Sequence, residues 1–195
     1  MPLILVTGLP SSGKSETAKI IFQFLKERLE QHDPRKVRIV SDSDVLDWDG
    51  RDTIYSSIAK EKELRGWLRA EAQRYVNLNQ IVILDAAAYI KGFRYEIFCL
   101  CKEAQTQYCV VERLISSDVC WNWNKLYSRE TFDGLVMRYE ECDQKNRWDS
   151  PLFKMRSESE TLDLEAIYRE AIEEDPLRSN KCTSLASSTV TVYKP

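Results

Sequence analysis

The chain has 195 residues, of which 43% are hydrophobic and 30% are charged, and its formal net charge is −3 at pH 7. These values are typical of a globular protein of about one domain, and they do not favour a nucleic-acid-binding domain, because such domains are usually basic. No apolar run approaches the ~20 residues that span a bilayer and no signal peptide is evident, so we expect a cytoplasmic and nuclear protein without membrane contact.

The numbers and spacing of cysteine and histidine limit the metal sites and the acid–base catalysts that this chain can form. The six cysteines form no C-x-x-C pair, which argues against a zinc site, and we interpret most of them as buried free thiols. His32 is the only histidine. Acid–base chemistry in this chain must therefore rely mainly on carboxylates, lysine or water.

The first predicted strand, residues 3–7, leads into a phosphate-binding motif. It is followed by G-L-P-S-S-G-K-S and then by helical periodicity to about Gln31. Strand, G-x-x-x-x-G-K-[ST] and helix together are the context of a P-loop, in which Lys14 reaches the β- and γ-phosphates and Ser15 holds Mg²⁺. We assign nucleotide contacts to Gly8, Leu9, Pro10, Ser11, Ser12, Gly13, Lys14, Ser15 and Glu16.

Two carboxylates follow the second predicted strand, residues 37–40. Asp42 and Asp44 stand just past its end, where open α/β sheets bind ligands. One of them could face the γ-phosphate and the metal, or the pair could cap a helix or form an Asx-turn. Residues 46–56 look like a mobile loop, and residues 57–77 predict a long helix.

The third predicted strand, residues 80–85, ends in Asp85 and has the form of a Walker B segment, whose aspartate lies near the Mg²⁺ of a P-loop. Residues 89–95 then place Lys91 and Arg94 beside three aromatic residues. This segment could grip nucleic acid or phosphate, or it could be a packed loop with a capping glycine.

The region between the fourth and fifth predicted strands, residues 107–112 and 152–155, contains two more helical patterns and several arginines. In small P-loop kinases this region is a lid whose arginines neutralise transition-state charge. We therefore predict catalytic roles for Arg138 and Arg147, with surface arginine as the alternative. A last helix is predicted at residues 162–172.

Five strands that alternate with helices predict an α/β fold: a five-stranded parallel sheet of the nucleotide-kinase-like P-loop type, with helices on both faces and an arginine-bearing lid. The P-loop should follow the central strand. We place this domain at residues 1–175 and interpret residues 176–195 as a polar linker or tail, in which residues 189–193 could pair at a sheet edge.

Five segments stand in the following order: M-P-L-I-L-V-T-G-L-P-S-S-G-K-S, S-D-S-D, E-K-x-L-R-G-x-L-R, Y-I-K-G-F-R-Y-E and N-R-W-D-S-P-L-F. Over about residues 1–155 they closely resemble the killer-toxin-insensitivity protein twelve family of Elongator-associated P-loop ATPases. A more distant resemblance is to O-phosphoseryl-tRNA kinase. The last two segments are far more specific than the P-loop itself.

The resemblance implies binding of ATP and Mg²⁺, tRNA-stimulated ATP hydrolysis, and assistance to the Elongator complex in modifying wobble uridines of tRNA. It carries Lys14 and Ser15 over as Walker A residues, Asp42 as the carboxylate after the second strand, and Asp85 as Walker B, so that Ser15, Asp42 and Asp85 are the expected metal residues. Family members continue into a helical tRNA-binding domain, whereas this sequence ends at Pro195. We expect a monomer that reaches tRNA mainly through that absent domain.

Two other functions remain open. A kinase that phosphorylates a tRNA-linked or small-molecule hydroxyl would use the same motifs, with Asp42 as its general base. A nucleotide-gated binding module is favoured by Ala86-Ala87-Ala88, because the family pattern has an asparagine just before Tyr89. The methyl group of Ala88 cannot make the polar contact that an amide would make.

Overall fold

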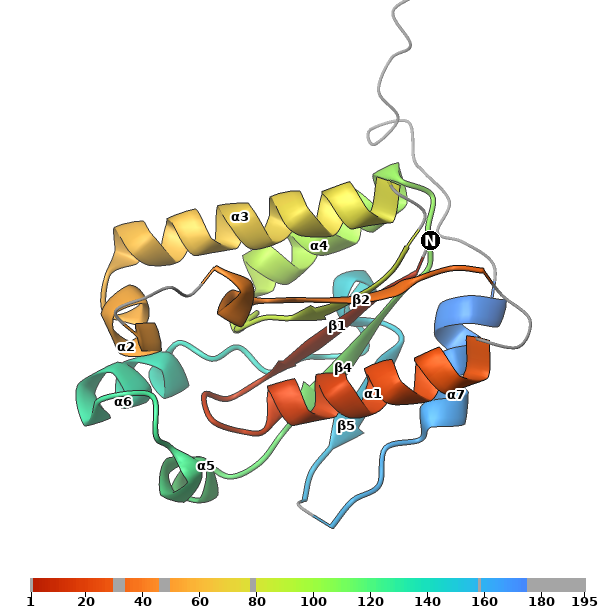
Figure 1. Cartoon of the computed structure of the whole chain (residues 1–195). Helices are drawn as coiled ribbons and strands as arrows, with labels where there is room; N and C mark the ends of the chain where they lie inside the picture. Colours follow the sequence, from red (N-terminus) through yellow and green to blue (C-terminus); the bar gives the residue numbers. More distant parts are fainter. Residues whose placement is uncertain (1, 30–33, 46–49, 78–79, 158, 175–195) are drawn as a thin grey trace, which may run out of the picture.

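The computed structural model describes residues 2–29, 34–45, 50–77, 80–157 and 159–174. Five strands form one parallel sheet in the order β2-β3-β1-β4-β5 (Figure 1). The strands are β1 (Leu3–Gly8), β2 (Val37–Ser41), β3 (Ile81–Asp85), β4 (Tyr108–Arg113) and β5 (Leu152–Met155). The predicted five-stranded parallel sheet, with the P-loop after its central strand, is confirmed.

Helices cover both faces of the sheet (Figure 1). The helices are α1 (Lys14–Leu29), α2 (Gly50–Tyr55), α3 (Ile58–Asn77), α4 (Lys91–Glu103), α5 (Ser117–Trp123), α6 (Arg129–Met137) and α7 (Leu164–Tyr168). Short 3-10 turns lie at Asp42–Asp44 and Arg147–Asp149, and α7 continues into a wider turn at Arg169–Glu173.

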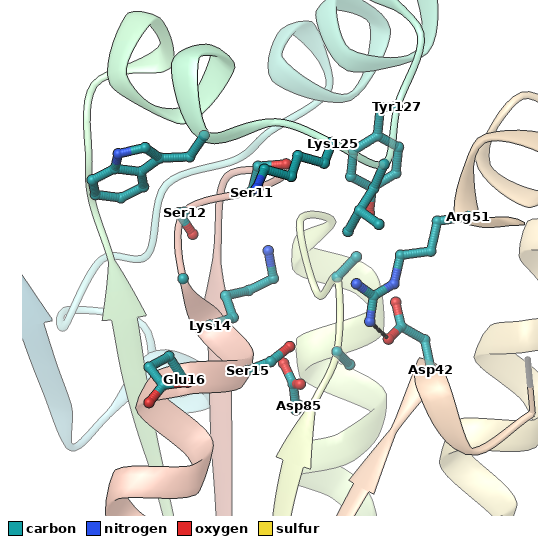
Figure 2. A pocket seen from close by; sticks show the side chains of 15 residues that line it. Ser11, Ser12, Lys14, Ser15, Glu16, Asp42, Arg51, Asp85, Lys125 and Tyr127 are labelled. Carbon is teal, nitrogen blue, oxygen red and sulfur yellow. Dashed lines mark hydrogen bonds and ion pairs between the residues drawn. The ribbon is translucent and has the colours of Figure 1, made fainter.

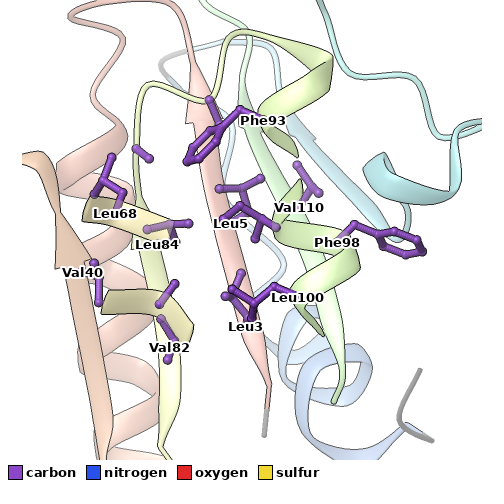
Figure 3. Close-up of a cluster of buried hydrophobic side chains, with 14 of the residues drawn as sticks. Leu3, Leu5, Val40, Leu68, Val82, Leu84, Phe93, Phe98, Leu100 and Val110 are labelled. Carbon is purple, nitrogen blue, oxygen red and sulfur yellow. The ribbon is translucent and has the colours of Figure 1, made fainter. Parts of the chain in front are cut away.

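Strand β1 is buried along its whole length because it lies in the middle of the sheet between two helical layers. Its side chains alternate between the layers, as a strand requires. Leu3 and Leu5 pack with α3 and α4, as Figure 3 shows, whereas Ile4 and Val6 pack with α1 and α7. The strand therefore joins two hydrophobic cores and fixes the position of the P-loop that follows it.

A third hydrophobic cluster lies outside the sheet, between the P-loop and the helices α5 and α6. Its buried members are Leu9, Ile115, Cys120 and Phe132. Trp121 adds an edge-to-face contact with Phe132, with 5.2 Å between ring centroids. The lid region is thus attached to the P-loop by a small core of its own.

The prediction of a mobile loop over residues 46–56 is wrong in its second half, because α2 occupies Gly50–Tyr55. A six-residue helix is too short to show a periodic pattern, and this one is held by burial of Ile54 and Tyr55. Residues 46–49, and the tail with its predicted edge strand at 189–193, lie outside the described residues.

The described cysteines are all free thiols, and four of them are buried, which agrees with the interpretation from sequence. Cys182 lies outside the described residues. Within the part of the chain that the structure describes, no helix is both long and apolar enough to cross a membrane.

Candidate functional site

The P-loop has a backbone conformation that depends on glycine. Gly8 and Gly13 have φ angles of +148° and +86°, and Ser11 also has a positive φ. A Cβ on Gly8 would lie 2.5 Å from the backbone oxygen of Arg113, which leaves no room for a side chain. Arg113 also donates from Nε to the backbone oxygen of Ser12 at 2.9 Å, so the end of β4 supports the loop from behind.

A pocket of about 440 Å³ lies beside this loop at the carboxyl edge of the sheet. Its lining residues are Ser11, Ser12, Gly13, Lys14, Ser15, Glu16, Asp42, Arg51, Asp85, Ala86, Ala87, Trp123, Lys125, Leu126 and Tyr127 (Figure 2). The structure thus brings six of the predicted nucleotide-binding residues to the pocket, together with both predicted metal carboxylates. Gly8, Leu9 and Pro10 belong to the loop but are not among the lining residues.

Lys14 is enclosed at the centre of the pocket (Figure 2). Its Nζ donates to the backbone oxygen of Leu9 at 2.7 Å. Burial lowers the pKa of Lys14, and the negative charges of Asp85 and Asp42 oppose that shift. The ammonium group is therefore anchored to the P-loop backbone within the pocket, where its charge can act on an anionic ligand.

Asp85 lies next to Ser15 at the base of the pocket (Figure 2). Ser41 donates to Asp85 Oδ2 at 3.3 Å. Burial raises the pKa of Asp85, and a hydrogen bond from Ser15 together with the charge of Lys14 counteracts part of the rise. A hydroxyl and a carboxylate are hard oxygen ligands of the kind that Mg²⁺ prefers, so Ser15 and Asp85 fit a Mg²⁺ site beside a phosphate.

The two carboxylates after β2 have different roles. Asp44 Oδ2 accepts from the backbone N–H of Ser41 at 3.0 Å, and the Ser41 hydroxyl accepts from the N–H of Ser43, so Asp44 belongs to a capping box. Asp42 instead faces the pocket and pairs with Arg51, whose Nη2 lies 2.6 Å from Asp42 Oδ1. The capping alternative thus holds for Asp44, and Asp42 is the carboxylate that lines the pocket.

Residues 124–128, which we name the clasp loop, close the pocket on the side of α5 and α6. Asn124 organises this loop: its Oδ1 accepts from the N–H groups of Leu126 and Tyr127, both at 3.1 Å, and its Nδ2 donates to the Tyr127 oxygen at 2.7 Å. Ser11 of the P-loop donates to the same Oδ1 at 3.0 Å. The P-loop and the clasp loop are therefore joined directly.

The far end of the clasp loop is tied to α2. Asp52 Oδ1 accepts from the backbone N–H and the hydroxyl of Ser128, at 2.7 and 2.9 Å. Tyr127 packs edge to face on Tyr55 of α2, with 5.9 Å between ring centroids. Helix α2 and the clasp loop thus form one continuous wall of the pocket.

The structure does not bring Arg138 or Arg147 to the pocket. Arg138 Nη1 donates to Glu61 Oε2 at 2.9 Å, and its guanidinium lies over the ring of Tyr89. Glu61 is buried and also accepts from Arg65 and from the Tyr89 hydroxyl. Arg147 is exposed in its 3-10 turn.

The suggestion that Arg94 grips nucleic acid is wrong. Its side chain is fully buried, and its Nε donates to Asp149 Oδ1 at 2.6 Å. Arg94 comes from the Y-I-K-G-F-R-Y-E segment and Asp149 from N-R-W-D-S-P-L-F. The two most specific segments thus meet in a buried ion pair. At Arg94 and Asp149, therefore, these segments stabilise the fold and do not contact a ligand. Lys91, by contrast, is exposed at the start of α4.

Besides Trp123 and Leu126, the sequence analysis missed three pocket residues: Arg51, Lys125 and Tyr127. Arg51 lies in the segment interpreted as a mobile loop, and the other two follow α5, where the pattern predicted more helix. Asn124, in the N-W-N-K sequence before Leu126, could have predicted a turn here, because an asparagine side chain can accept a hydrogen bond from the backbone N–H two residues later.

With this geometry in place, comparison with known proteins identifies the family. The family model described as chromatin-associated protein KTI12 matches residues 1–193. The chain belongs to the KTI12 family. This confirms the resemblance inferred from the five sequence segments.

Relatives within the family are similar over most of this chain. KTI12 homologues from Danio rerio and Xenopus laevis are each 47% identical, over 174 and 173 residues, which is 86% of this chain and 60% of each homologue. The crystal structure of Chaetomium thermophilum Kti12 in complex with ADP-AlF3 has a TM-score of 0.77 and 31% identity, and the match covers 87% of this chain and 99% of that chain. This chain spans about 60% of the length of the two curated relatives, and its fold is a P-loop, kinase-like α/β fold.

Proposed function

We propose that this chain binds ATP with Mg²⁺ and hydrolyses it. The observation that carries this proposal is the convergence of Lys14, Ser15 and Asp85 on one pocket beside a loop whose glycines have positive φ angles. Lys14 would neutralise phosphate charge, and Ser15 and Asp85 would hold the metal. Bound Mg²⁺ would supply charge stabilisation at the transferred phosphoryl group.

An unpartnered group in the P-loop supports a phosphate ligand. The hydroxyl of Ser12 is fully buried and has no hydrogen-bond partner among the described residues. A buried donor without a partner costs free energy, and a phosphate oxygen would relieve that cost. Ser12 also belongs to the residues that line the pocket.

The Chaetomium relative supports phosphoryl transfer more specifically, because it was crystallised with ADP-AlF3. Aluminium fluoride beside ADP has the planar shape of a phosphoryl group in transfer. We infer that the equivalent pocket of this chain serves hydrolysis of the γ-phosphate bond, with water as the acceptor.

We further propose that this ATPase is stimulated by tRNA and assists the Elongator complex in wobble-uridine modification. Membership of the family supports this step, and the family description as chromatin-associated supports a nuclear location. Because this chain spans only part of its relatives, tRNA binding is proposed to depend mainly on the remaining part of those proteins.

The geometry gives little support to the two alternatives. A kinase would need Asp42 as a free general base, but both of its carboxylate oxygens accept hydrogen bonds here. The binding module rested on Ala86-Ala87-Ala88: Ala86 and Ala87 line the pocket, whereas the Ala88 side chain, which stands where the family has an asparagine, is buried in the hydrophobic core and does not line it. Its backbone oxygen accepts from Thr7 and Arg94.

The test is release of inorganic phosphate from ATP by this chain, with and without tRNA. We expect Mg²⁺-dependent release that Lys14→Ala abolishes, whereas Lys60→Ala, on the exposed surface of α3, retains it. Equal rates in the Lys14→Ala variant and the parent chain would refute the proposal. Labelled γ-phosphate that appears on RNA or on a small molecule would instead establish a kinase.

A further inference from the structure

The pocket contains its own positive charges, and they differ from the lid arginines expected from the sequence. Among the described lining residues three are cationic: Lys14, Arg51 and Lys125. Lys14 is the P-loop lysine, and Lys125 is exposed on the clasp loop. The Arg51 side chain is only 17% exposed, and Figure 2 shows it extending from α2 toward Asp42 and the pocket interior. Among the described lining residues, Arg51 is therefore the one largely buried cation that comes from outside the P-loop.

Only part of the Arg51 guanidinium is engaged. Its Nη2 donates to Asp42 Oδ1 at 2.6 Å and to the Ser43 hydroxyl at 2.7 Å. Its Nε is buried and finds no hydrogen-bond partner among the described residues. A guanidinium has five N–H donors in a rigid fork, so one part can remain on a carboxylate while another binds an anion.

Asp42 differs from Asp85 in having a guanidinium partner, Arg51, at 2.6 Å. Asp42 Oδ1 accepts from Arg51, Oδ2 accepts from the Tyr55 hydroxyl at 3.2 Å, and the one proton of the Ser41 hydroxyl is shared between Asp42 and Asp85. Both oxygens thus face protein donors, and the charge is already paired with a guanidinium. This arrangement suits a residue that holds Arg51 better than one that holds a metal ion.

We propose that Arg51 is a catalytic residue that contacts the terminal phosphate of the bound nucleotide, and that Asp42 is the positioning residue that orients it. Metal binding then falls to Ser15 and Asp85. This inference rests on the proposed function, since it needs a nucleotide in the pocket.

The helix that carries Arg51 is fixed on both sides. Asp52 joins it to the clasp loop through Ser128, and Tyr55 joins it to Asp42. The position of the clasp loop and the position of Arg51 are therefore linked through a single short helix. Arg138, held by Glu61 outside the pocket, has no comparable connection to the phosphate site.

The first experiment replaces Arg51 and measures ATP hydrolysis and nucleotide binding. We expect Arg51→Ala to lower kcat about 100-fold or more, the loss typical of one transition-state donor. Affinity for the non-hydrolysable analogue AMPPNP should change little, whereas affinity for ADP with aluminium fluoride should fall strongly. Arg51→Lys should recover only part of the rate, because a lysine lacks the fork. Arg74→Ala, a charge-matched change in an exposed ion pair on α3, is the control.

The second experiment tests whether Asp42 acts through Arg51. Asp42→Asn should lower kcat to a similar degree, leave the Mg²⁺ concentration for half-maximal rate unchanged, and add nothing to Arg51→Ala in the double variant. Asp85→Asn should raise that Mg²⁺ concentration. Multiplicative losses in the double variant, or a Mg²⁺ shift with Asp42→Asn like that with Asp85→Asn, would overturn the assignment.

The measurements distinguish a failure of the proposed ATP hydrolysis from a failure of the proposed role of Arg51. If the parent chain binds AMPPNP but releases no phosphate, hydrolysis is refuted, and binding of ADP with aluminium fluoride still tests Arg51. If the parent chain hydrolyses ATP and Arg51→Ala does so at the same rate, the proposed function stands and the role of Arg51 is refuted. Thermal melting of each variant separates either result from a failure to fold.

Discussion

The buried pair Arg94–Asp149 gives the sharpest stability prediction. Both side chains are fully buried, and Asp149 Oδ1 lies 2.6 Å from Arg94 Nε. Asp149→Ala would leave the guanidinium charge buried without a counter-charge, which typically costs about 3–5 kcal/mol. For a chain of this size 1 kcal/mol corresponds to about 2–4 °C, so the melting temperature should fall by about 6–20 °C.

The matched comparison removes both charges at once. In Arg94→Met combined with Asp149→Leu, both charges of the pair are removed, and the Ala88 oxygen keeps its hydrogen bond from Thr7 at 3.2 Å. Because apolar replacement of a whole buried pair is often neutral, the double variant should be more stable than Asp149→Ala alone. Urea unfolding measures each free energy. A loss below about 1 kcal/mol for Asp149→Ala, or a double variant whose loss equals the sum of the single losses, would refute the structural role of this pair.

Three further predictions concern the pocket and its surroundings. Gly8→Ala should destabilise the chain by at least about 2 kcal/mol, because the added Cβ would collide with the backbone oxygen of Arg113. Gly66→Ala should instead stabilise the chain by up to about 1 kcal/mol in the same unfolding assay, because Gly66 lies within helix α3 and an added Cβ would meet no other atom. Burial raises the pKa of Asp85 in the folded chain above its ordinary value of 3.8, so the ionised carboxylate destabilises the fold at neutral pH. Asp85→Asn should therefore raise the melting temperature at neutral pH. This gain should vanish as the pH falls below 3.8, where the carboxyl group is protonated in both the folded and the unfolded chain. Asn124→Ala removes four side-chain hydrogen bonds and should speed tryptic cleavage of the clasp loop about tenfold or more, with little change in global stability; an unchanged cleavage rate would contradict the anchoring role.

The sequence predicts the sheet and the P-loop well because both depend on local signals. The apolar runs of β1 and β3 have no polar alternation, which is the pattern of strands covered on both faces. The glycines and Lys14 stand at fixed spacings between a strand and a helix. Asp85 follows from its place at a strand end, and the structure puts it next to Ser15.

The sequence predicts the pocket wall formed by α2 and the clasp loop poorly, because tertiary contacts determine the positions of these segments. Arg51 stands in a short polar segment without periodicity, and only its pairing with Asp42 shows its place. Arg94 has the composition of a nucleic-acid contact, yet its partner lies far along the chain at Asp149. A charged residue does not reveal its partner from spacing alone, so Arg138 was assigned to the pocket although Glu61 holds it elsewhere.

The small core beneath α5 and α6 has a consequence for the energetics of the whole molecule. Its buried residues are few: Leu9, Ile115, Cys120 and Phe132, compared with the two large clusters on the faces of the sheet. A unit with little buried apolar area opens at a fraction of the global unfolding free energy. Amide hydrogens of α5 and α6 should accordingly exchange with solvent well before those of β1, while the sheet stays folded.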